Sequence, residues 1–297
     1  MFVTLFLVLL ILFTGGIFAI EKLGLFSRDI MDDVEPWINP DSAFAKKYPD
    51  VRRINVLVLG DTDQSLTDTI MLASFDVDLK RVDIVSVPRD TYFERPDHPG
   101  AAWQKINSVN KSEGIDAMGY AVSEVLGEVP IQYYAIFTDD DVRAIVDAMG
   151  GIEIDVPMDM KYTSKKHNLY IDLKKGKQTL DGDQAVQFLR FRKGYPTGDL
   201  GRVEAQQNFM IQAFKQSISL GFPKVAKIVA DQVEANLKTR MAVRIAGEAV
   251  GMSSKDKETW ITPGEPKTMN RASYFIVDEK EAVKMMNEIY SIKAEEE

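Results

Sequence analysis

The chain has 297 residues, of which 45% are hydrophobic and 27% are charged, enough for one large domain or two small ones. Its net charge of −9 argues against a nucleic-acid partner, because such proteins usually present a basic face. It has no cysteine, which excludes disulfides, thiolate metal sites and cysteine nucleophiles. Chemistry that needs a histidine base would depend on His98 or His167, and both lie in polar stretches typical of exposed positions.

The first stretch, Phe2 to Ile20, carries no charge and is rich in Leu, Ile, Phe and Val. At about 1.5 Å per residue its length is close to a bilayer core of roughly 30 Å. A cleaved signal peptide usually has a basic start, a shorter apolar core and a small-residue exit, and this stretch lacks these features. We therefore expect residues 1–21 to be an uncleaved transmembrane anchor, residues 22–50 a linker, and residues 51–297 a domain outside the cytoplasm.

Three short apolar runs rich in β-branched residues follow, and they predict strands over Ile54–Gly60, Thr69–Asp76 and Val82–Val87. The first run leads into an acidic loop and the third ends at Arg89 and Asp90. Sites in sheets of this kind gather at strand ends, in loops held by a rigid scaffold.

The acidic loop after the first strand contains Asp61, Asp63 and Asp68. Clustered carboxylates are typical ligands of hard cations, and Mg²⁺ prefers one or two of them together with waters and phosphate oxygens. The alternative is that these aspartates only shape turns and cap helices.

The middle and end of the chain alternate helical and strand patterns. We expect helices over Gly114–Leu126 and Thr138–Met149, a strand between them, and a half-exposed strand over Ile152–Pro157. Beyond a helix that starts at Arg202, we expect two amphipathic helices within residues 225–250, a strand over Ala272–Val277 and a final helix over Glu279–Ile292. This order predicts an α/β (α+β) sandwich, with a central mixed β-sheet flanked by helices and preceded by the transmembrane helix.

The stretch from Arg190 to Gln206 concentrates guanidinium groups around a Gly/Pro/Asp turn. If Arg190 and Arg192 are in a strand they point to one face, and if Arg202 opens a helix it shares a face with Gln206. Such a concentration of like charge suits a multiply anionic ligand, because Arg binds phosphate or carboxylate oxygens as a bidentate fork. The alternative is that each Arg pairs with a nearby surface acid.

Taken together and in order, these motifs resemble the LytR-CpsA-Psr family of cell-wall transferases over about Ile54 to Phe214. The ordered pieces are Thr67-Asp68-Thr69-Ile70-Met71-Leu72, Ser86-Val87-Pro88-Arg89-Asp90-Thr91, Lys105-Ile106-Asn107, Gly150-Gly151-Ile152-Glu153-Ile154-Asp155-Val156-Pro157, Leu180-Asp181-Gly182-Asp183-Gln184-Ala185, Arg190-Phe191-Arg192, and Gly198-Asp199-Leu200-Gly201-Arg202 with Gln206-Gln207. Each piece is weak alone, and the ordered set is specific.

The resemblance implies a Mg²⁺-dependent phosphotransferase, with Mn²⁺ as an alternative ion. Such an enzyme is anchored in the cell membrane by a single helix, with its catalytic domain outside the cytoplasm. It moves a glycopolymer, such as teichoic acid or capsule, from a polyprenyl-pyrophosphate carrier to a hydroxyl of peptidoglycan as a phosphodiester. Phosphoryl transfer requires positioning and charge neutralisation, which a site of arginines, aspartates and a metal can supply.

The resemblance also implies roles for individual residues. Asp68, with Asp61 or Asp63, would bind the metal, and Asp90 would organise the site or help to deprotonate the acceptor. The pyrophosphate would be held by Arg89, Arg190, Arg192, Arg202 and Gln206.

Two positions depart from the family pattern. Leu66 and Ala205 stand where many relatives have arginine. One phosphate contact is therefore expected to be missing, or to be replaced by Lys105 or Lys193.

Two other functions remain open alongside the transferase. The same site in a phosphatase would release the pyrophosphate-linked polymer to water. A non-catalytic binder of lipid-linked glycans would fit the missing arginine at Leu66. Apolar residues around Phe188 and Phe209 would line a polyprenyl slot in the family, although their helical spacing is also typical of plain core.

Overall fold

The structure is a computed structural model that describes residues 29–61, 66–165, 169–192, 194–195, 201–202, 204–206, 208–209, 212, 233–248 and 257–292. Within these ranges no helix is long and apolar enough to cross a membrane. The anchor predicted for residues 1–21, together with His167, Asp63 and Lys193, lies outside the described residues, and the anchor stays a prediction.

The chain folds as two compact units, where we had expected one domain from residue 51 onward. The sheet unit contains the described residues up to 135, then 235–237 and those from 248 onward. The hairpin unit contains residues 136–234 and 238–247. Each unit is described separately below.

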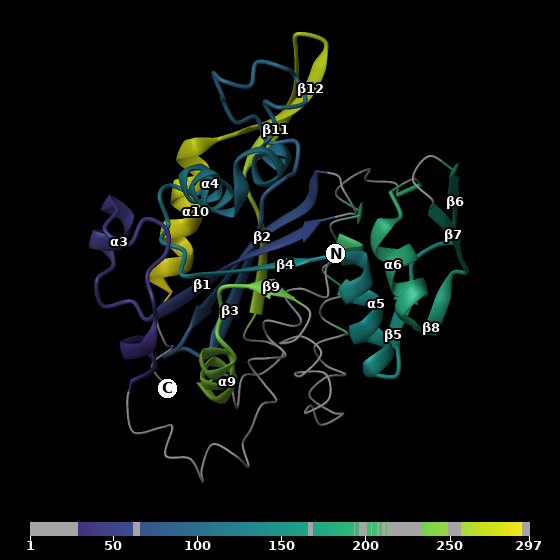
Figure 1. The fold of residues 1–297 in the computed structure, drawn as a ribbon, viewed down its shortest axis with the longest axis horizontal. Helices are drawn as coiled ribbons and strands as arrows, with labels where there is room; N and C mark the ends of the chain where they lie inside the picture. The colour runs from purple at the N-terminus through teal and green to yellow at the C-terminus, as the bar shows by residue number, and fades with distance from the viewer. Residues whose placement is uncertain are drawn as a thin grey trace. The chain divides into compact units, whose positions relative to one another are not determined.

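A six-stranded mixed sheet has the strand order β10-β3-β2-β1-β4-β9. Its strands are β1 (Arg53–Asp61), β2 (Thr67–Asp76), β3 (Arg81–Ser86), β4 (Tyr133–Phe137), β9 (Glu234–Ala235) and β10 (Lys257–Ile261). Strands β1, β2 and β3 pair antiparallel and lie side by side in Figure 1, whereas β10 pairs parallel to β3. Residues 53–60 of β1 are all buried, as expected for an apolar run covered on both faces. The mixed sheet and its first three strands are therefore confirmed.

The sheet unit also contains η1 (Ile30–Asp33), α3 (Ala43–Lys47), η2 (Ile106–Ser108), α4 (Val109–Val125) and α10 (Glu279–Ser291). Helix α10 packs on the sheet through Tyr290, whose hydroxyl accepts a hydrogen bond of 2.6 Å from Asn55 Nδ2 on β1. The Tyr290 ring also meets Phe44 of α3 edge to face, with centroids 4.8 Å apart. Helix α4 begins five residues before the predicted start at Gly114, where the backbone interrupts the helix with φ +86°.

Residues 29–50, which we expected to be part of a linker, are folded onto the sheet unit. Ile30, Ile38 and Phe44 are buried, and Ile38 exchanges two backbone hydrogen bonds with Ile131 at 2.8 and 3.0 Å. The prolines in this segment separate short folded elements, so the folded part of the chain begins before Val51.

A two-stranded hairpin, β11 (Gly264–Met269) and β12 (Ala272–Val277), projects from the sheet unit (Figure 1). The turn residues Asn270 and Arg271 both have positive φ, 50° and 65°, as a two-residue hairpin turn requires. Our prediction contained β12 and missed β11 and β10. Phe275 of β12 forms a bridge to Thr91, in the segment that follows β3.

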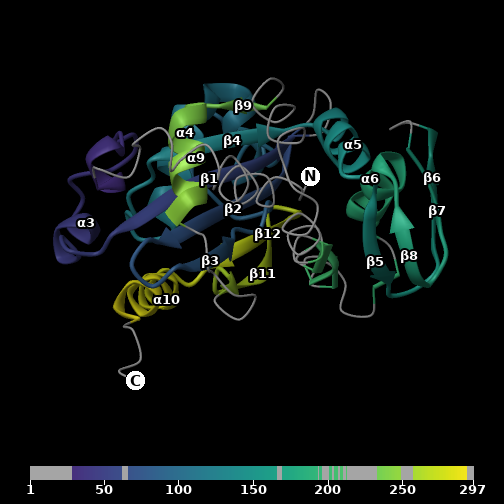
Figure 2. The same cartoon turned by 90° about the horizontal axis from the view of Figure 1, so that it is seen from below.

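The hairpin unit contains α5 (Asp139–Ala148), α6 (Gly182–Arg190), α9 (Thr239–Glu248) and two antiparallel strand pairs, β5 (Ile152–Val156) with β8 (Gly176–Leu180) and β6 (Met160–Ser164) with β7 (Leu169–Leu173). Figure 2 shows both pairs on the same side of α6. Thr138 and Asp181 close capping boxes at the starts of α5 and α6. Gly150 and Gly151, with φ +79° and +93°, end α5 as predicted.

Candidate functional site

Acidic and basic side chains meet at one edge of the sheet, where β1 ends and β2 begins. An irregularity between Gly60 and Asp61 places Asp61 opposite Thr67 in the antiparallel register. Arg89, three residues after the end of β3, donates from Nη1 to Asp68 Oδ1 in a close ion pair. The structure therefore brings Asp61, Asp68 and Arg89 together, as the position of each at a strand end predicted.

The Asp61 carboxyl is in an environment that disfavours its charge. Burial raises the pKa of Asp61, hydrogen bonds from Thr67 and Asn110 lower it in part, and the negative charge of Asp68 raises it further. Asn110 Nδ2 donates to Asp61 Oδ2 at 3.1 Å. A cation at this edge would remove the repulsion between the two carboxylates.

A metal site built wholly from protein groups is not evident in the described part of the chain, which holds no cluster of three or more histidines and acids suited to a metal. Mg²⁺ does not need such a cluster, because it retains waters and binds substrate phosphates. Asp61 and Asp68 are the two described carboxylates at this edge.

Asp90 lies next to this edge and is paired with a lysine. Lys105 Nζ lies 2.8 Å from Asp90 Oδ1, and Arg89 Nε lies 3.9 Å from Asp90 Oδ2. The backbone of Asp90 is fixed from the other side, since its carbonyl accepts a hydrogen bond of 2.8 Å from Phe275 N. Lys105, which we considered as a replacement phosphate ligand, therefore has Asp90 as its ionic partner.

Our sequence reasoning missed one polar residue at this edge, Asn110. It lies three residues beyond Asn107 of the Lys105-Ile106-Asn107 motif, in the first turn of α4. The backbone N–H of Asn107 donates to the carbonyl of Arg89 at 3.3 Å. The helical spacing after that motif was the signal that could have identified Asn110.

In the hairpin unit, Arg190 is the last residue of α6, so of the two conformations left open by the sequence, the helix precedes Arg190 and the strand does not form. Arg190 Nη1 instead lies 2.8 Å from Oδ2 of Asp139, the buried first residue of α5. The chain becomes extended at Phe191, which is buried, and Arg192 is exposed.

Arg202 and Gln206 are helical residues, and both are buried. Gln206 Nε2 donates to the carbonyl oxygen of Leu189 at 2.8 Å, which ties this segment to the end of α6. Burial raises the pKa of Tyr195 to about 12, and the positive charge of Arg202 opposes that rise. Ala205, where relatives often have arginine, is buried between these two positions.

Known proteins resemble this chain over most of its length. The model of the LytR_cpsA_psr family matches residues 37–291, so the chain belongs to this family. The protein named polyisoprenyl-teichoic acid–peptidoglycan teichoic acid transferase TagU of Bacillus cereus is 30% identical over 233 residues, covering 75% of this chain and 74% of that protein. The protein of the same name from Oceanobacillus iheyensis is 27% identical over 310 residues, covering 95% of this chain and 90% of its own.

Solved structures show the same fold. The crystal structure of Bacillus subtilis TagV superposes with a TM-score of 0.67 at 24% identity, covering 82% of this chain and 99% of that chain. The structure named TagT bound to LIIa-WTA superposes with a TM-score of 0.65 at 21% identity, covering 86% of this chain and 95% of that chain. The family resemblance found in the sequence motifs is therefore confirmed.

Proposed function

We propose that this protein is a membrane-anchored phosphotransferase that moves a glycopolymer from a polyprenyl-pyrophosphate carrier to a hydroxyl of peptidoglycan, forming a phosphodiester. The observation that carries the proposal is the meeting of Asp61, Asp68 and Arg89 at one sheet edge, beside the Asp90–Lys105 pair. Relatives of similar length are named teichoic acid transferases, which supports the same reaction class here. In this proposal, the membrane anchor is the uncharged stretch within residues 1–21.

The metal in this proposal is Mg²⁺, or Mn²⁺ in its place, held by Asp68 with Asp61, or with Asp63 as the alternative to Asp61. The raised pKa of Asp61 supports this choice, because a nearby cation would stabilise the charged form of that carboxyl. When bound, the ion would neutralise the oxygens of the pyrophosphate.

The remaining groups have separate roles in the proposal. Asp90 accepts the proton of the acceptor hydroxyl, and the oxygen of that hydroxyl forms a new bond to the phosphorus that carries the glycopolymer. The bond from this phosphorus to the bridging oxygen of the pyrophosphate breaks, and polyprenyl phosphate leaves with the electron pair. Lys105, 2.8 Å from Asp90 Oδ1, holds that carboxylate in position. The pyrophosphate oxygens are held by Arg89, Arg190, Arg192, Arg202 and Gln206.

The ion pairs of the described residues are compatible with this proposal. Arg89 and Arg190 each contact an aspartate, Asp68 and Asp139, which is the arrangement expected of surface ion pairs as well. Unlike ordinary surface ion pairs, however, both pairs are formed by side chains that are mostly buried. Such partners hold the guanidinium groups in fixed orientations, which favours binding of a phosphate without reorganisation.

The test uses the full chain in mild detergent with a lipid-pyrophosphate glycopolymer, Mg²⁺ and soluble peptidoglycan oligosaccharides, with products analysed by mass. We expect a phosphodiester adduct that disappears in EDTA. Asp68→Ala should lower turnover by about 100-fold or more, the scale of losing one electrostatic group in an active site. Asp140→Ala is the matched control, because the Asp140 side chain is 82% exposed on α5 and pairs only with Arg143 among the contacts described.

Other results would support different functions. Release of the polymer to water, with or without an acceptor, would indicate a phosphatase. Lipid-glycan binding without any product would indicate a non-catalytic binder, a function that the absence of arginine at Leu66 favours. In that case Leu66→Arg should restore turnover if the missing arginine is the cause.

A further inference from the structure

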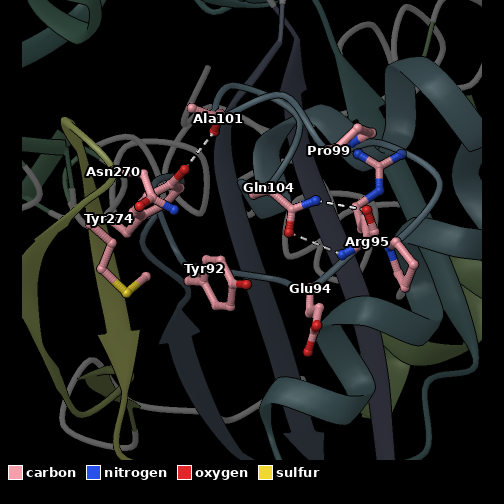
Figure 3. A pocket seen from close by; sticks show the side chains of 10 residues that line it. Tyr92, Glu94, Arg95, Pro99, Ala101, Gln104, Asn270 and Tyr274 are labelled. Atoms are coloured by element: carbon pink, nitrogen blue, oxygen red, sulfur yellow. Dashed lines mark hydrogen bonds between the residues drawn. The ribbon is translucent and has the colours of Figure 1, made fainter.

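A cavity of about 330 Å³ opens in the sheet unit, between the loop of residues 92–104 and the tip of the β11–β12 hairpin (Figure 3). Figure 3 shows Tyr92 in the middle of its lining, with Asn270 and Tyr274 of the hairpin on one side and Glu94 and Gln104 of the loop on the other. This volume is at the small end of ligand pockets. The cavity uses none of the residues to which we have assigned a role in the transfer.

The walls of this cavity are fixed by hydrogen bonds. The Tyr274 hydroxyl donates to the carbonyl of Ala101 at 3.1 Å, which joins the hairpin to the loop. Gln104 Nε2 donates to the carbonyls of Arg95 and His98 at 2.7 and 2.6 Å. The Tyr92 and Tyr274 rings meet edge to face, with centroids 5.3 Å apart and planes at 85°. The pocket is therefore formed before a ligand binds, which lowers the entropy cost of binding.

The lining favours a neutral, hydroxyl-rich ligand. Arg95 is buried, and its guanidinium donates to the Trp103 carbonyl, to Ser108 and to Glu113, so its charge is engaged within the protein. The rest of the lining includes the Tyr92 and Tyr274 rings, the Asn270 amide and the exposed carboxylate of Glu94, together with the apolar side chains of Pro96, Pro99, Ala101 and Met269. Aromatic faces bind the C–H faces of a sugar ring, and amide and carboxylate oxygens accept its hydroxyl protons.

The cavity is next to Asp90. Tyr92 follows Asp90 by two residues, and Phe275 of β12 holds the backbone of both. The Phe275 N–H donates to the Asp90 carbonyl, and the Tyr92 N–H donates to the Phe275 carbonyl, each at 2.8 Å. Lys105 connects the two places directly, because its Nζ is 2.8 Å from Asp90 Oδ1 and 5.8 Å from the centroid of the Tyr274 ring. When one part of a ligand is held on Tyr92, the adjoining part of the same ligand is therefore within reach of Asp90.

We infer that this cavity is the acceptor subsite and binds an uncharged N-acetylated amino sugar of the peptidoglycan strand, so that a hydroxyl of the strand reaches Asp90. The inference rests on the proposed function, in which Asp90 accepts the proton of that hydroxyl. It assigns Tyr92 as the stacking platform, and Asn270 and Glu94 as hydrogen-bonding groups for the sugar.

The experiment measures binding and transfer separately on the full chain in detergent. The binding probe is a soluble β-1,4-linked N-acetylglucosamine tetramer, titrated by calorimetry without donor lipid. Tyr92→Ala should weaken tetramer binding about tenfold and raise the KM for the acceptor by a similar factor, the size of one aromatic contact. The KM for the donor lipid should stay within about twofold, since Tyr92 is not among the pyrophosphate ligands.

Two further variants make the result specific. Asn270→Gly removes the amide while keeping the positive φ of the turn, and should weaken tetramer binding about threefold even if Tyr92→Ala fails to fold. Tyr170→Ala is the matched control, because Tyr170 is a 62% exposed tyrosine on β7 of the hairpin unit. It should change neither tetramer affinity nor acceptor KM.

The outcomes separate this inference from the proposed function. Transfer with an unchanged acceptor KM in both Tyr92→Ala and Asn270→Gly would overturn the subsite and leave the transferase intact. Tetramer binding that depends on Tyr92, in a protein that gives no adduct, would support the glycan site and refute the transferase. Binding of a peptidoglycan stem peptide in place of the tetramer would overturn the choice of sugar as the ligand.

Discussion

Asp83 of β3 is a fully buried carboxylate that contacts three strands. It accepts a hydrogen bond of 2.9 Å from Arg53 Nη1 of β1, one of 2.8 Å from Arg81 Nη2 of its own strand, and one of 3.1 Å from Trp260 Nε1 of β10. Arg53 is buried too, and its other acid is Asp76, 3.2 Å away. Removing Asp83 would therefore leave a buried guanidinium with one acid and a half-buried indole N–H without its acceptor.

The size of the effect follows from these contacts. Breaking a buried ion pair by removing one partner costs about 3–5 kcal/mol. Because Asp76 remains beside Arg53, we expect Asp83→Ala to lower the free energy of unfolding by about 3 kcal/mol, at the lower end of that range. Asp83→Asn keeps an oxygen acceptor for Trp260 and loses only the charge, so we expect a loss of about 2 kcal/mol.

The assay is urea unfolding followed by circular dichroism and by the fluorescence of the three tryptophans, one of which is Trp260 on the edge strand β10. Asp140→Ala serves as control, since its 82% exposed ion pair should contribute less than about 1 kcal/mol. If Asp83→Asn cost no more than this control, the contacts of Asp83 would not stabilise the sheet and the reasoning would be refuted.

Three further predictions concern single residues. Burial raises the pKa of Asp61 above its ordinary value of 3.8, so the folded chain binds the carboxyl proton more tightly than the unfolded chain does. The free energy of unfolding therefore falls as the pH rises from the pKa of Asp61 in the unfolded chain to its higher pKa in the folded chain. In EDTA, Asp61→Asn should thus raise the urea midpoint more at pH 7 than at pH 4; equal gains at both pH values would contradict this. Arg192→Ala should weaken binding of a pyrophosphate lipid, measured by calorimetry, by about 1.5–3 kcal/mol, and an unchanged affinity would make Arg192 an ordinary surface residue. Gly182→Ala would place a Cβ 2.6 Å from the carbonyl oxygen of Arg143, and should lower the unfolding free energy by about 1–3 kcal/mol in the urea assay, whereas wild-type stability would show that α5 and α6 can separate at no cost.

Local patterns predicted much of the fold. The apolar run of β1, the Thr138 cap of α5 and the paired glycines after α5 each leave a signal within a few residues of the element they define. Strand β10 leaves no such signal, because Lys257–Ile261 mixes charged and apolar residues. It is a strand because it pairs with β3, and Trp260 bonds to Asp83, a residue 177 positions earlier in the chain. Periodicity cannot reveal a partner at that separation.

The candidate site also has one part that the sequence predicted and one part that it did not. The meeting of Asp61, Asp68 and Arg89 followed from predicted strand ends, since an antiparallel sheet returns the chain to one edge. The partner of Arg190 did not follow, because Asp139 lies 51 residues earlier and on another helix. The sequence was also ambiguous between strand and helix before Arg190, and the capping box at Asp181 decided for the helix. Contacts between residues that are far apart in the sequence, such as Arg190 with Asp139, could be identified only from the structure.

The packing of α10 on β1 has a consequence for the order of folding. Asn55 and Phe44, early in the chain, complete their contacts only with Tyr290, which is separated from Asn55 by 235 positions. During synthesis the first strand of the sheet therefore emerges long before the residue that covers it, and a chain with such distant contacts folds slowly. A product that stops short of α10 would expose the side chains of β1 and α3 that Tyr290 contacts to proteases. The cover of the first strand therefore depends on a helix that is synthesised more than 200 residues later.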